Sequence, residues 1–306
     1  MSKVIPLVTV LGPTAVGKTT FAANLAIELN AEIISADSRQ VYKGMDIGTG
    51  KDMVDYTVNG FTVPSHLIDI ADPGTEYNVF QFQRDFESAR LSVIENGKLP
   101  LMCGGTGMYL EAVLKGYSFA EAPIDDDLRK ELADYQDEEL VARLHQSRIV
   151  HNTTDILDRD RLIRAIEIEK YRLKKKSVPK ENIFLNTPVF GIRFDRKIVR
   201  QRITARLMQR LNEGMVEEVQ HLIETGITRD RLKMYGLEYK YITMFLDGEL
   251  SNNEMVTLLN TAIHQFAKRQ MTWFRRMENN GIKILWLEGE DGLQFNLNKA
   301  KDYLKI

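Results

Sequence analysis

The chain has 306 residues, which is long enough for one large domain with an ample core and a second, smaller domain. Its 43% hydrophobic and 27% charged residues are typical of a folded globular protein, and no apolar run approaches the ~18 residues of a membrane span. The net charge of −2 carries no information about nucleic acid, although acidic and basic residues are segregated along the chain. The single cysteine, Cys103, excludes an internal disulfide and a cysteine-based zinc cluster. We therefore expect a cytoplasmic protein with no signal peptide and no membrane contact.

The first third of the chain alternates short apolar runs with amphipathic segments. Residues 4–11 predict a strand, which a glycine loop connects to an alanine-rich helix over residues 18–29. Residues 32–35 and 66–70 predict two further strands. Asn78 is suited to cap a helix that runs to about Glu95 and that Gly97 ends.

Residues 99–103 predict another buried strand, which enters a glycine-rich turn over residues 104–107 and then a helix. Strands that alternate with helices indicate a parallel sheet covered by helices on both faces. The fold class is therefore α/β.

The pattern changes after about residue 118. Residues 118–183 contain no convincing strand, and their charged helical patterns are acidic at first and basic later. Residues 189–194 predict a returning core strand. Long helices are expected over residues 196–225, 230–247 and 252–279, followed by a strand over 282–287. We interpret residues 118–183 as a helical insertion into one α/β core made of residues 1–117 and 184–306.

A phosphate-binding motif lies between the first predicted strand and the first predicted helix. Its glycines let backbone N–H groups converge on phosphate oxygens, Lys18 adds a positive charge, and the Thr19 hydroxyl suits Mg²⁺. The motif indicates that the protein binds a di- or triphosphate with a metal ion, but it does not identify the ligand as ATP. The alternative is a glycine-rich turn that binds no ligand. Its residues are Gly12, Pro13, Thr14, Ala15, Val16, Gly17, Lys18 and Thr19.

Further segments carry candidate functional residues. Asp37 follows the second predicted strand, where a carboxylate could bind the water shell of a metal ion, accept a proton from a substrate, or only cap a helix. The glycine-rich turn could carry Thr106 to the same edge of the sheet. The segment DIGTGK, residues 46–51, is a weak signal alone.

Two basic segments complete the set. In the segment that begins at Asp158, Leu162 and Ile166 can face a core while Arg161 and Arg164 form a neighbouring stripe. The segment QFAKRQMTWFRR mixes cations with aromatic rings, which suits phosphate contact and base stacking. A solvated basic helix face is the alternative for both.

Taken together, these segments are specific. The combination of GPTAVGKT, SADSRQVY, DIGTGK, HLID, GGTGMY, DRLIRAIE and QFAKRQMTWFR resembles the tRNA dimethylallyltransferase family in order and spacing over nearly the whole chain. Members of this family transfer the dimethylallyl group of dimethylallyl diphosphate to N6 of adenine 37, next to the anticodon, and release pyrophosphate. The resemblance implies a P-loop NTPase-like sheet with an inserted tRNA-binding helical domain.

The resemblance also implies roles for individual residues. The phosphate loop and Lys233 would bind the diphosphate, Thr19 would help to hold Mg²⁺, and Asp37 would act on the adenine amine with Lys18 and Thr19 as catalytic partners. The positions that match tRNA contacts of the family are Asp37, Ser38, Arg39, Gln40, Thr106, Arg129, Asp160, Arg161, Leu162, Ile163, Arg164, Gln265 and Arg269.

A basic surface is expected to hold the tRNA. Arg202, Arg206 and Arg210 lie four residues apart, which gives one helix a cationic stripe, and residues 174–176 are three lysines.

The chain departs from the family in one segment. Lys233 stands where an arginine is usual, and Leu237 stands where a tyrosine is usual. A lysine lacks the bidentate fork of arginine, so the grip on pyrophosphate is in question. The absence of a C-terminal Cys/His finger favours the bacterial type, and we expect a monomer.

Three alternatives stay open. An isopentenyltransferase that acts on free AMP, ADP or ATP would share the phosphate loop and Asp37, but would not need the insertion. A small-molecule kinase would transfer a phosphoryl group from ATP. A non-catalytic RNA-binding P-loop protein would leave Asp37 dispensable.

Overall fold

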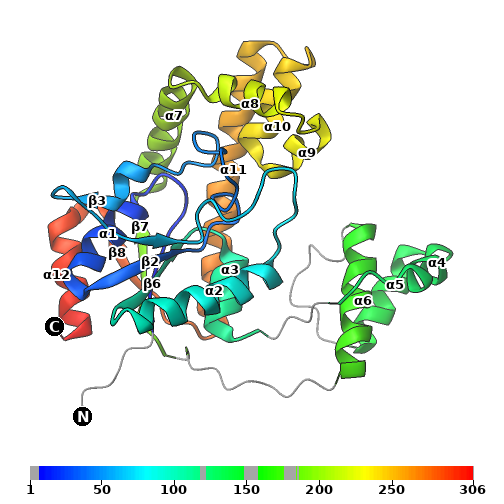
Figure 1. Ribbon diagram of the computed structural model, residues 1–306, viewed down its shortest axis with the longest axis horizontal. Helices are drawn as coiled ribbons and strands as arrows, with labels where there is room; N and C mark the ends of the chain where they lie inside the picture. The colour runs from blue at the N-terminus through cyan, green and yellow to red at the C-terminus, as the bar shows by residue number, and fades with distance from the viewer. Residues whose placement is uncertain (1–6, 118–121, 148–157, 176–183, 185, 306) are drawn as a thin grey trace. The chain divides into compact units, whose positions relative to one another are not determined.

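The computed structural model describes residues 7–117, 122–147, 158–175, 184 and 186–305 (Figure 1). The chain forms two compact units, Met1–Gly116 with Asn182–Ile306, and Tyr117–Glu181. The bounds of the second unit differ by at most two residues from those of the insertion expected over residues 118–183. No helix among the described residues is long and apolar enough to cross a membrane.

The first unit contains a six-stranded, fully parallel sheet with the strand order β5-β2-β6-β1-β7-β8. The strands are β1 Val8–Leu11, β2 Ala31–Ser35, β5 Ser65–His66, β6 Leu99–Gly104, β7 Val189–Arg193 and β8 Leu285–Glu288. A separate two-stranded hairpin pairs β3 Thr57–Val58 with β4 Phe61–Thr62. The expected parallel α/β sheet is confirmed. The strand predicted over residues 66–70 was wrong beyond His66, because Leu67 and Asp69 take left-handed backbone conformations that no strand permits.

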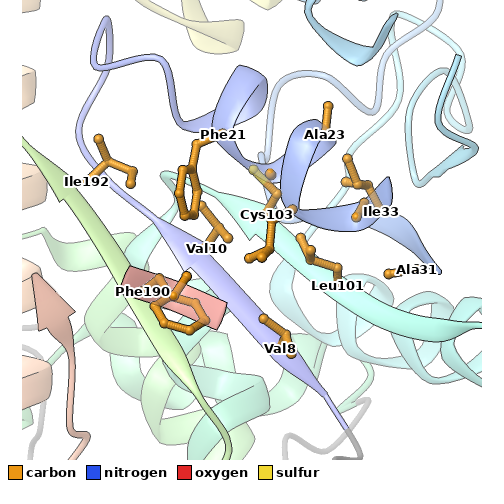
Figure 2. Packing of buried hydrophobic residues seen from close by; sticks show 14 of the residues in the cluster. Val8, Val10, Phe21, Ala23, Ala31, Ile33, Leu101, Cys103, Phe190 and Ile192 are labelled. Atoms are coloured by element: carbon orange, nitrogen blue, oxygen red, sulfur yellow. The ribbon is translucent and has the colours of Figure 1, made fainter. Parts of the chain in front are cut away.

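Helices cover both faces of the sheet (Figure 1). Side chains on alternate positions of a strand point to opposite faces. Val8 and Val10 therefore pack toward α1 Lys18–Leu29 and α12 Leu293–Leu304. The close view of this core shows both valines with Phe21 of α1 (Figure 2). Leu7 and Leu11 pack toward the face covered by α2 Val79–Glu95, α3 Gly107–Lys115 and α11 Asn252–Asn279.

The predicted cap of α2 is confirmed. The Asn78 side chain accepts from the backbone N–H groups of Phe80 and Gln81, and the Gln81 side chain in turn accepts from the N–H of Asn78. Two helices expected to be continuous are each split in two. Gly214, with φ of 99°, separates α7 Arg196–Asn212 from α8 Met215–Glu224, and Gly236 separates α9 Arg229–Tyr235 from α10 Leu237–Leu246. The terminal helix α12 was not predicted.

The helices α7 to α11 form a second core of the first unit. Tyr239, which is fully buried, lies in this core beside Met45 and Leu259. The core fixes α7 and α11, and these two helices contribute side chains to the site described below.

The second unit is helical in its described part. Its helices are α4 Asp126–Ala133, α5 Asp137–Ser147 and α6 Arg159–Lys175. They share a small core of their own, formed by Leu128, Leu132, Leu140, Leu144, Leu162, Ala165 and Ile166. We expected residues 118–183 to be helical, and the elements described here are helices; residues 118–121, 148–157 and 176–183 of this segment lie outside the described residues.

Candidate active site

A cavity of about 350 Å³, here named the central cavity, lies at the carboxyl ends of β1, β2 and β6. The loops after these strands form one wall, and residues of α7 and α11 form another. Ligands of open α/β sheets bind at this edge, outside the carboxyl ends of parallel strands. The predicted site residues that line the cavity are Thr14, Ala15, Gly17, Lys18, Thr19, Asp37, Ser38, Arg39, Gln40, Thr106 and Arg269.

The phosphate loop presents an open helix N-terminus to this cavity. Gly17, with φ of 75°, precedes α1, and no side chain caps the helix, so the N-terminal N–H groups and the helix dipole are available to an anion. Ala15 is held at a φ of 64°, which is uncommon for a residue with a side chain, and its carbonyl accepts from Arg202 Nε at 2.8 Å. This conformation is typical of a loop built to approach a ligand closely.

Three residues of the motif do not line the cavity. A side chain at Gly12 would collide with the carbonyl oxygen of Ile192 on β7, so this glycine allows close packing of the loop against the sheet. Val16 is buried in the core, and Pro13 faces a different cavity. We therefore assign these three residues to the shape of the loop.

Lys18 is partly buried and lines the central cavity at the end of the phosphate loop. Burial lowers the pKa of its ammonium, and the neighbouring guanidinium groups of Arg206 and Arg210 lower it further, while Asp37 raises it. Cys103 does not supply a countercharge, because burial raises the pKa of its thiol to about 12. The Asp37 carboxylate thus supports the positive charge of Lys18, and a bound anion would strengthen it.

Asp37 is positioned by the loop after β2 and by the glycine-rich turn after β6. Its carboxylate accepts from the N–H of Arg39 at 3.0 Å. The Thr106 hydroxyl accepts from the N–H of Ser38 at 3.0 Å, and the N–H of Thr106 donates to the carbonyl of Ala36 at 3.3 Å. These contacts fix the backbone on both sides of Asp37. The prediction that Thr106 reaches this edge of the sheet is confirmed.

The glycines of that turn permit three close approaches. A side chain at Gly104 would collide with the backbone of Ala36, and one at Gly107 would collide with the ring of Trp273. A side chain at Gly105 would displace the amide of Gln270, which donates to the Gly105 carbonyl at 2.9 Å. The turn is therefore a packing junction between the Asp37 loop and α11.

The DIGTGK segment forms a loop that is fixed by a side chain of another element. One carboxylate, that of Glu218 on α8, accepts from the N–H groups of Asp46, Ile47 and Gly48 at 2.7 to 3.0 Å. The side chain of Lys51 is buried and pairs with Asp46 at 2.8 Å. These contacts keep Gly48, Thr49 and Gly50 at the cavity wall.

Two of the three arginines of the α7 stripe, which we expected on an RNA-binding surface, face the central cavity. Arg206 and Arg210 line this cavity, and both bind the carboxylate of Asp52, at 2.5 Å and 3.0 Å respectively. Arg202 is exposed and lies over the ring of Phe194, at 4.7 Å from its centre. Ile203 and Leu207 on the same helix are buried in the second core. Arg206 and Arg210 are thus anion-binding candidates that the sequence analysis missed.

α11 presents a stripe of polar and aromatic side chains to the cavity. The guanidinium groups of Arg39 and Arg269 lie 5.2 Å and 5.9 Å from the ring centre of Phe266. Trp273 is fixed by a hydrogen bond of 2.9 Å from its indole N–H to the buried carboxylate of Glu111. Phe266 and Trp273 offer aromatic faces of the kind on which nucleobases stack.

Gln265 lies on a neighbouring stripe of α11 and does not line the central cavity. It lines a second cavity of about 680 Å³, here named the basic cavity, together with Pro13 and Trp286. Four cationic side chains of this cavity have no carboxylate partner among the described residues. They are Arg196, Arg200, Lys268 and Arg275.

Lys233 is not brought to either cavity. Its ammonium pairs with Glu249 at 2.8 Å and with Asp247 at 3.3 Å, which raises its pKa. α9 orients Lys233 toward these two acids, because Leu232 and Tyr235 are the buried residues of that helix. The expectation that Lys233 binds diphosphate does not fit this geometry, whereas Arg206 and Arg210 line the central cavity.

The remaining predicted RNA contacts belong to the helical unit. Arg129 and Arg164 both bind the fully buried carboxylate of Glu167, at 2.7 Å and 2.9 Å. The arginines lower the pKa of Glu167, although burial alone would raise it. Leu162 is buried in the core of this unit, and Ile163 packs against that core. Asp160 and Arg161 are exposed.

A magnesium ion fits the central cavity only with a phosphate ligand. No group of three or more acidic, histidine or cysteine side chains in the described part of the chain could hold a metal ion. Thr19, Asp37 and Asp55 nevertheless place a hydroxyl and two carboxylates on the cavity wall. This donor set fits, because Mg²⁺ is commonly bound by one or two protein oxygens together with substrate phosphates and water.

The fold and the central cavity define a P-loop-like protein. Its helix N-terminus, one lysine and two arginines converge on a space that also contains a carboxylate. Such a site can hold a diphosphate beside a group that accepts a proton.

Comparison with known proteins narrows this class. The IPP transferase family pattern matches residues 40–277, and the isopentenyl transferase pattern matches residues 5–60. The chain is 54% identical over 299 residues to tRNA dimethylallyltransferase 2 of Bacteroides fragilis, with 98% of each chain covered. It is 51% identical to tRNA dimethylallyltransferase 1 of Geotalea uraniireducens, over 98% of this chain and 97% of the relative.

A solved structure agrees with these relatives. The tRNA isopentenylpyrophosphate transferase of Bacillus halodurans superposes with a TM-score of 0.69 at 31% identity, over 98% of this chain and 96% of that chain. The chain belongs to the tRNA dimethylallyltransferase family.

Proposed function

We propose that this transferase moves the dimethylallyl group of dimethylallyl diphosphate to N6 of adenine 37 in tRNA, giving N6-isopentenyladenosine and pyrophosphate. One observation carries the proposal: the phosphate loop with Lys18 and Thr19 lines the same cavity as Asp37. An allylic diphosphate held by the phosphate loop and an adenine amine can therefore meet in one cavity.

The donor half of the site stabilises the leaving group. As the allylic C–O bond breaks, negative charge develops on the departing pyrophosphate. Lys18, the N-terminus of α1, and the guanidinium groups of Arg206 and Arg210 face this charge. Fixed charges aimed at a developing charge lower the barrier without reorganisation. Mg²⁺ bound with Thr19 would neutralise further phosphate charge.

The acceptor half of the site orients the amine. The lone pair of the exocyclic adenine nitrogen is delocalised into the ring, so the amine needs both alignment and removal of its proton. Asp37 is held by Arg39 and by the Thr106–Ser38 contact, and its carboxylate accepts that proton as the N–C bond forms. General-base catalysis of this type contributes roughly 10²- to 10⁴-fold to the rate. The target base leaves its stack, and Phe266 and Trp273 provide aromatic walls for it.

Two features favour tRNA over a free nucleotide as the acceptor. An enzyme that acts on free AMP would not need the helical unit, residues 117–181. The cations of the basic cavity that have no carboxylate partner among the described residues lie on α7 and α11, and both helices also line the central cavity. They suit the phosphates of nucleotides that flank the target base.

The test uses labelled dimethylallyl diphosphate and Mg²⁺ with either tRNA or AMP as acceptor. Label is expected in tRNA at adenine 37 and not in AMP. Label in AMP alone would support the adenylate isopentenyltransferase, and phosphoryl transfer from ATP without prenyl transfer would support a kinase. Chelation of Mg²⁺ is expected to abolish turnover, and added Mg²⁺ to restore it.

A further inference from the structure

Asp52 occupies an unusual position for an acidic residue. It lies directly after the DIGTGK loop, and its carboxylate faces two arginines that line the central cavity. The Oδ2 atom is 2.5 Å from Arg206 Nη2 and 3.0 Å from Arg210 Nη2, and the Oδ1 atom is 3.1 Å from Arg210 Nη2. One carboxylate thus neutralises the two guanidinium groups beside the phosphate loop.

The loop is shaped to bring Asp52 to the arginines. Gly50, with φ of 72°, precedes it by two residues, and a side chain at this glycine would collide with the guanidinium groups of both Arg206 and Arg210. The Gly50 carbonyl accepts from the Gln40 side chain at 3.0 Å, which fixes the loop on the side of Asp37. The lack of a side chain at Gly50 therefore lets the loop cover the two arginines closely.

The contact lies between two connected spaces. A cavity of about 560 Å³, here named the outer cavity, is lined by Asp52 and shares Ala15, Gly17, Arg206 and Arg210 with the central cavity. The side chain of Asp52 is 40% exposed, whereas that of Arg210 is only 11% exposed. The carboxylate can therefore move toward solvent while the arginines stay in place.

The electrostatics show why the arginines need an anion. Burial lowers the pKa of Arg206, and repulsion from Arg210 lowers it further, so the two adjacent cations destabilise each other. Burial would raise the pKa of the Asp52 carboxyl, but the attraction of both arginines lowers it. Asp52 stays ionised, and its two oxygens accept charge-assisted hydrogen bonds from guanidinium groups that could equally donate to phosphate oxygens.

We propose that Asp52 is an internal competitor of the donor diphosphate, and that it weakens the binding of dimethylallyl diphosphate and of the product pyrophosphate. The proposal rests on the proposed function for the identity of the donor. When a diphosphate binds between Lys18 and the arginines, Asp52 either releases the guanidinium groups or stays beside the new anion as a like charge. Both outcomes cost binding free energy, and the return of Asp52 to the arginines favours release of the product.

If Asp52 competes with the diphosphate, removal of its negative charge is expected to strengthen the binding of pyrophosphate. Asp52→Asn keeps the shape and an oxygen that accepts hydrogen bonds, but removes the charge. Inorganic pyrophosphate with saturating Mg²⁺ is titrated into the protein by calorimetry. The variant is expected to bind roughly tenfold more tightly than the wild type, because a competing negative charge is gone.

Glu213→Gln is the matched control. It removes the same charge from the wall of the outer cavity, where the Glu213 carboxylate accepts a hydrogen bond from the side chain of Gln209 and not from either arginine. Its effect on pyrophosphate affinity is expected to be clearly smaller than that of Asp52→Asn. Equal tightening by both variants would show general repulsion in place of a specific competitor and would overturn the proposal.

The other outcomes are equally clear. Unchanged or weaker pyrophosphate binding by Asp52→Asn, with thermal unfolding like that of the wild type, would show that Asp52 only positions the arginines, and would overturn the proposal. If Asp52→Asn lowers the thermal midpoint, Asp52→Ser is measured as well. The proposal would also be overturned if neither variant binds pyrophosphate more tightly than the wild type. The measurement of pyrophosphate affinity needs no acceptor. Failure of the wild type to prenylate tRNA would therefore contradict the proposed function but would not decide the role of Asp52.

Discussion

The side-chain amide of Gln270 joins the two halves of the phosphate site by accepting a hydrogen bond of 2.9 Å from the backbone N–H of Thr14. The same amide donates to the carbonyl of Gly105 at 2.9 Å. Gln270 is buried, so each bond is shielded from water. One side chain of α11 therefore sets the distance between the phosphate loop and the glycine-rich turn that supports Asp37.

Gln270→Ala is expected to lower kcat/KM for prenyl transfer by roughly 100-fold, because small misplacements of reacting groups cost about this much. The loss is expected mainly in kcat, since the phosphate loop remains but shifts relative to the Asp37 loop. Steady-state kinetics with tRNA and dimethylallyl diphosphate measure both constants. Gln220→Ala, an exposed substitution of the same type on α8, serves as the control and should leave kcat/KM unchanged.

Asp37→Asn is expected to lower turnover by about 10²- to 10⁴-fold, because the amide cannot take the proton of the adenine amine. Pyrophosphate affinity should change little, since Lys18 and the N-terminus of α1 are retained. Single-turnover kinetics and calorimetric titration separate the two effects. Turnover within threefold of the wild type would remove Asp37 from its proposed role.

Lys233→Ala is expected to leave pyrophosphate affinity unchanged, because the Lys233 ammonium is engaged by Asp247 and Glu249 away from the central cavity. Arg206→Ala is expected to weaken the same affinity by roughly 10- to 100-fold, since a charge-assisted hydrogen bond contributes about 1.5–3 kcal/mol. The two variants are compared in one calorimetric experiment. A larger loss for Lys233→Ala than for Arg206→Ala would contradict the geometry of the site.

Glu167→Gln tests the centre of the helical unit. The folded state lowers the pKa of Glu167, so the stability that this carboxylate adds is fully present above its unfolded pKa of about 4.3 and is lost as the pH falls through the lower folded pKa. At pH 7 the variant is expected to be about 1–3 kcal/mol less stable, because two arginines lose their charged partner.

Hydrogen exchange of the amides of α4 and α6 measures this difference. The gap in protection between wild type and Glu167→Gln should be largest near neutral pH and should narrow below about pH 4. A gap that widens in acid would mean that the sign of the pKa shift is wrong. Amides of β1 and β6 provide the internal control.

The sequence was sufficient for the elements that depend on local signals. The helix Lys18–Leu29 and the long helix Asn252–Asn279 have the bounds that apolar periodicity predicted, and the Asn78 cap was readable from one residue type at one position. The phosphate loop and Asp37 could be placed together because the carboxyl ends of parallel strands lie at one edge of a sheet.

Local sequence signals could not predict which part of the molecule the α7 arginines face. Their spacing of four residues places Arg206 and Arg210 on one face of α7, but this spacing does not show whether that face lines a cavity or lies on the surface. Asp52 decides the question through a pairing 154 residues away in sequence, which no local pattern contains. The position of Lys233 could not be predicted for the same reason. Its ammonium pairs with Asp247 and Glu249 on the loop after α10, and the family motif gives no sign of these partners.

The bond between Thr14 and Gln270 spans 256 residues. During synthesis the glycine loop is therefore made long before its partner on α11. A nascent chain that ends before residue 270 carries a phosphate loop without the hydrogen bonds of Gln270, and the loop cannot yet be held at its final distance from the glycine-rich turn.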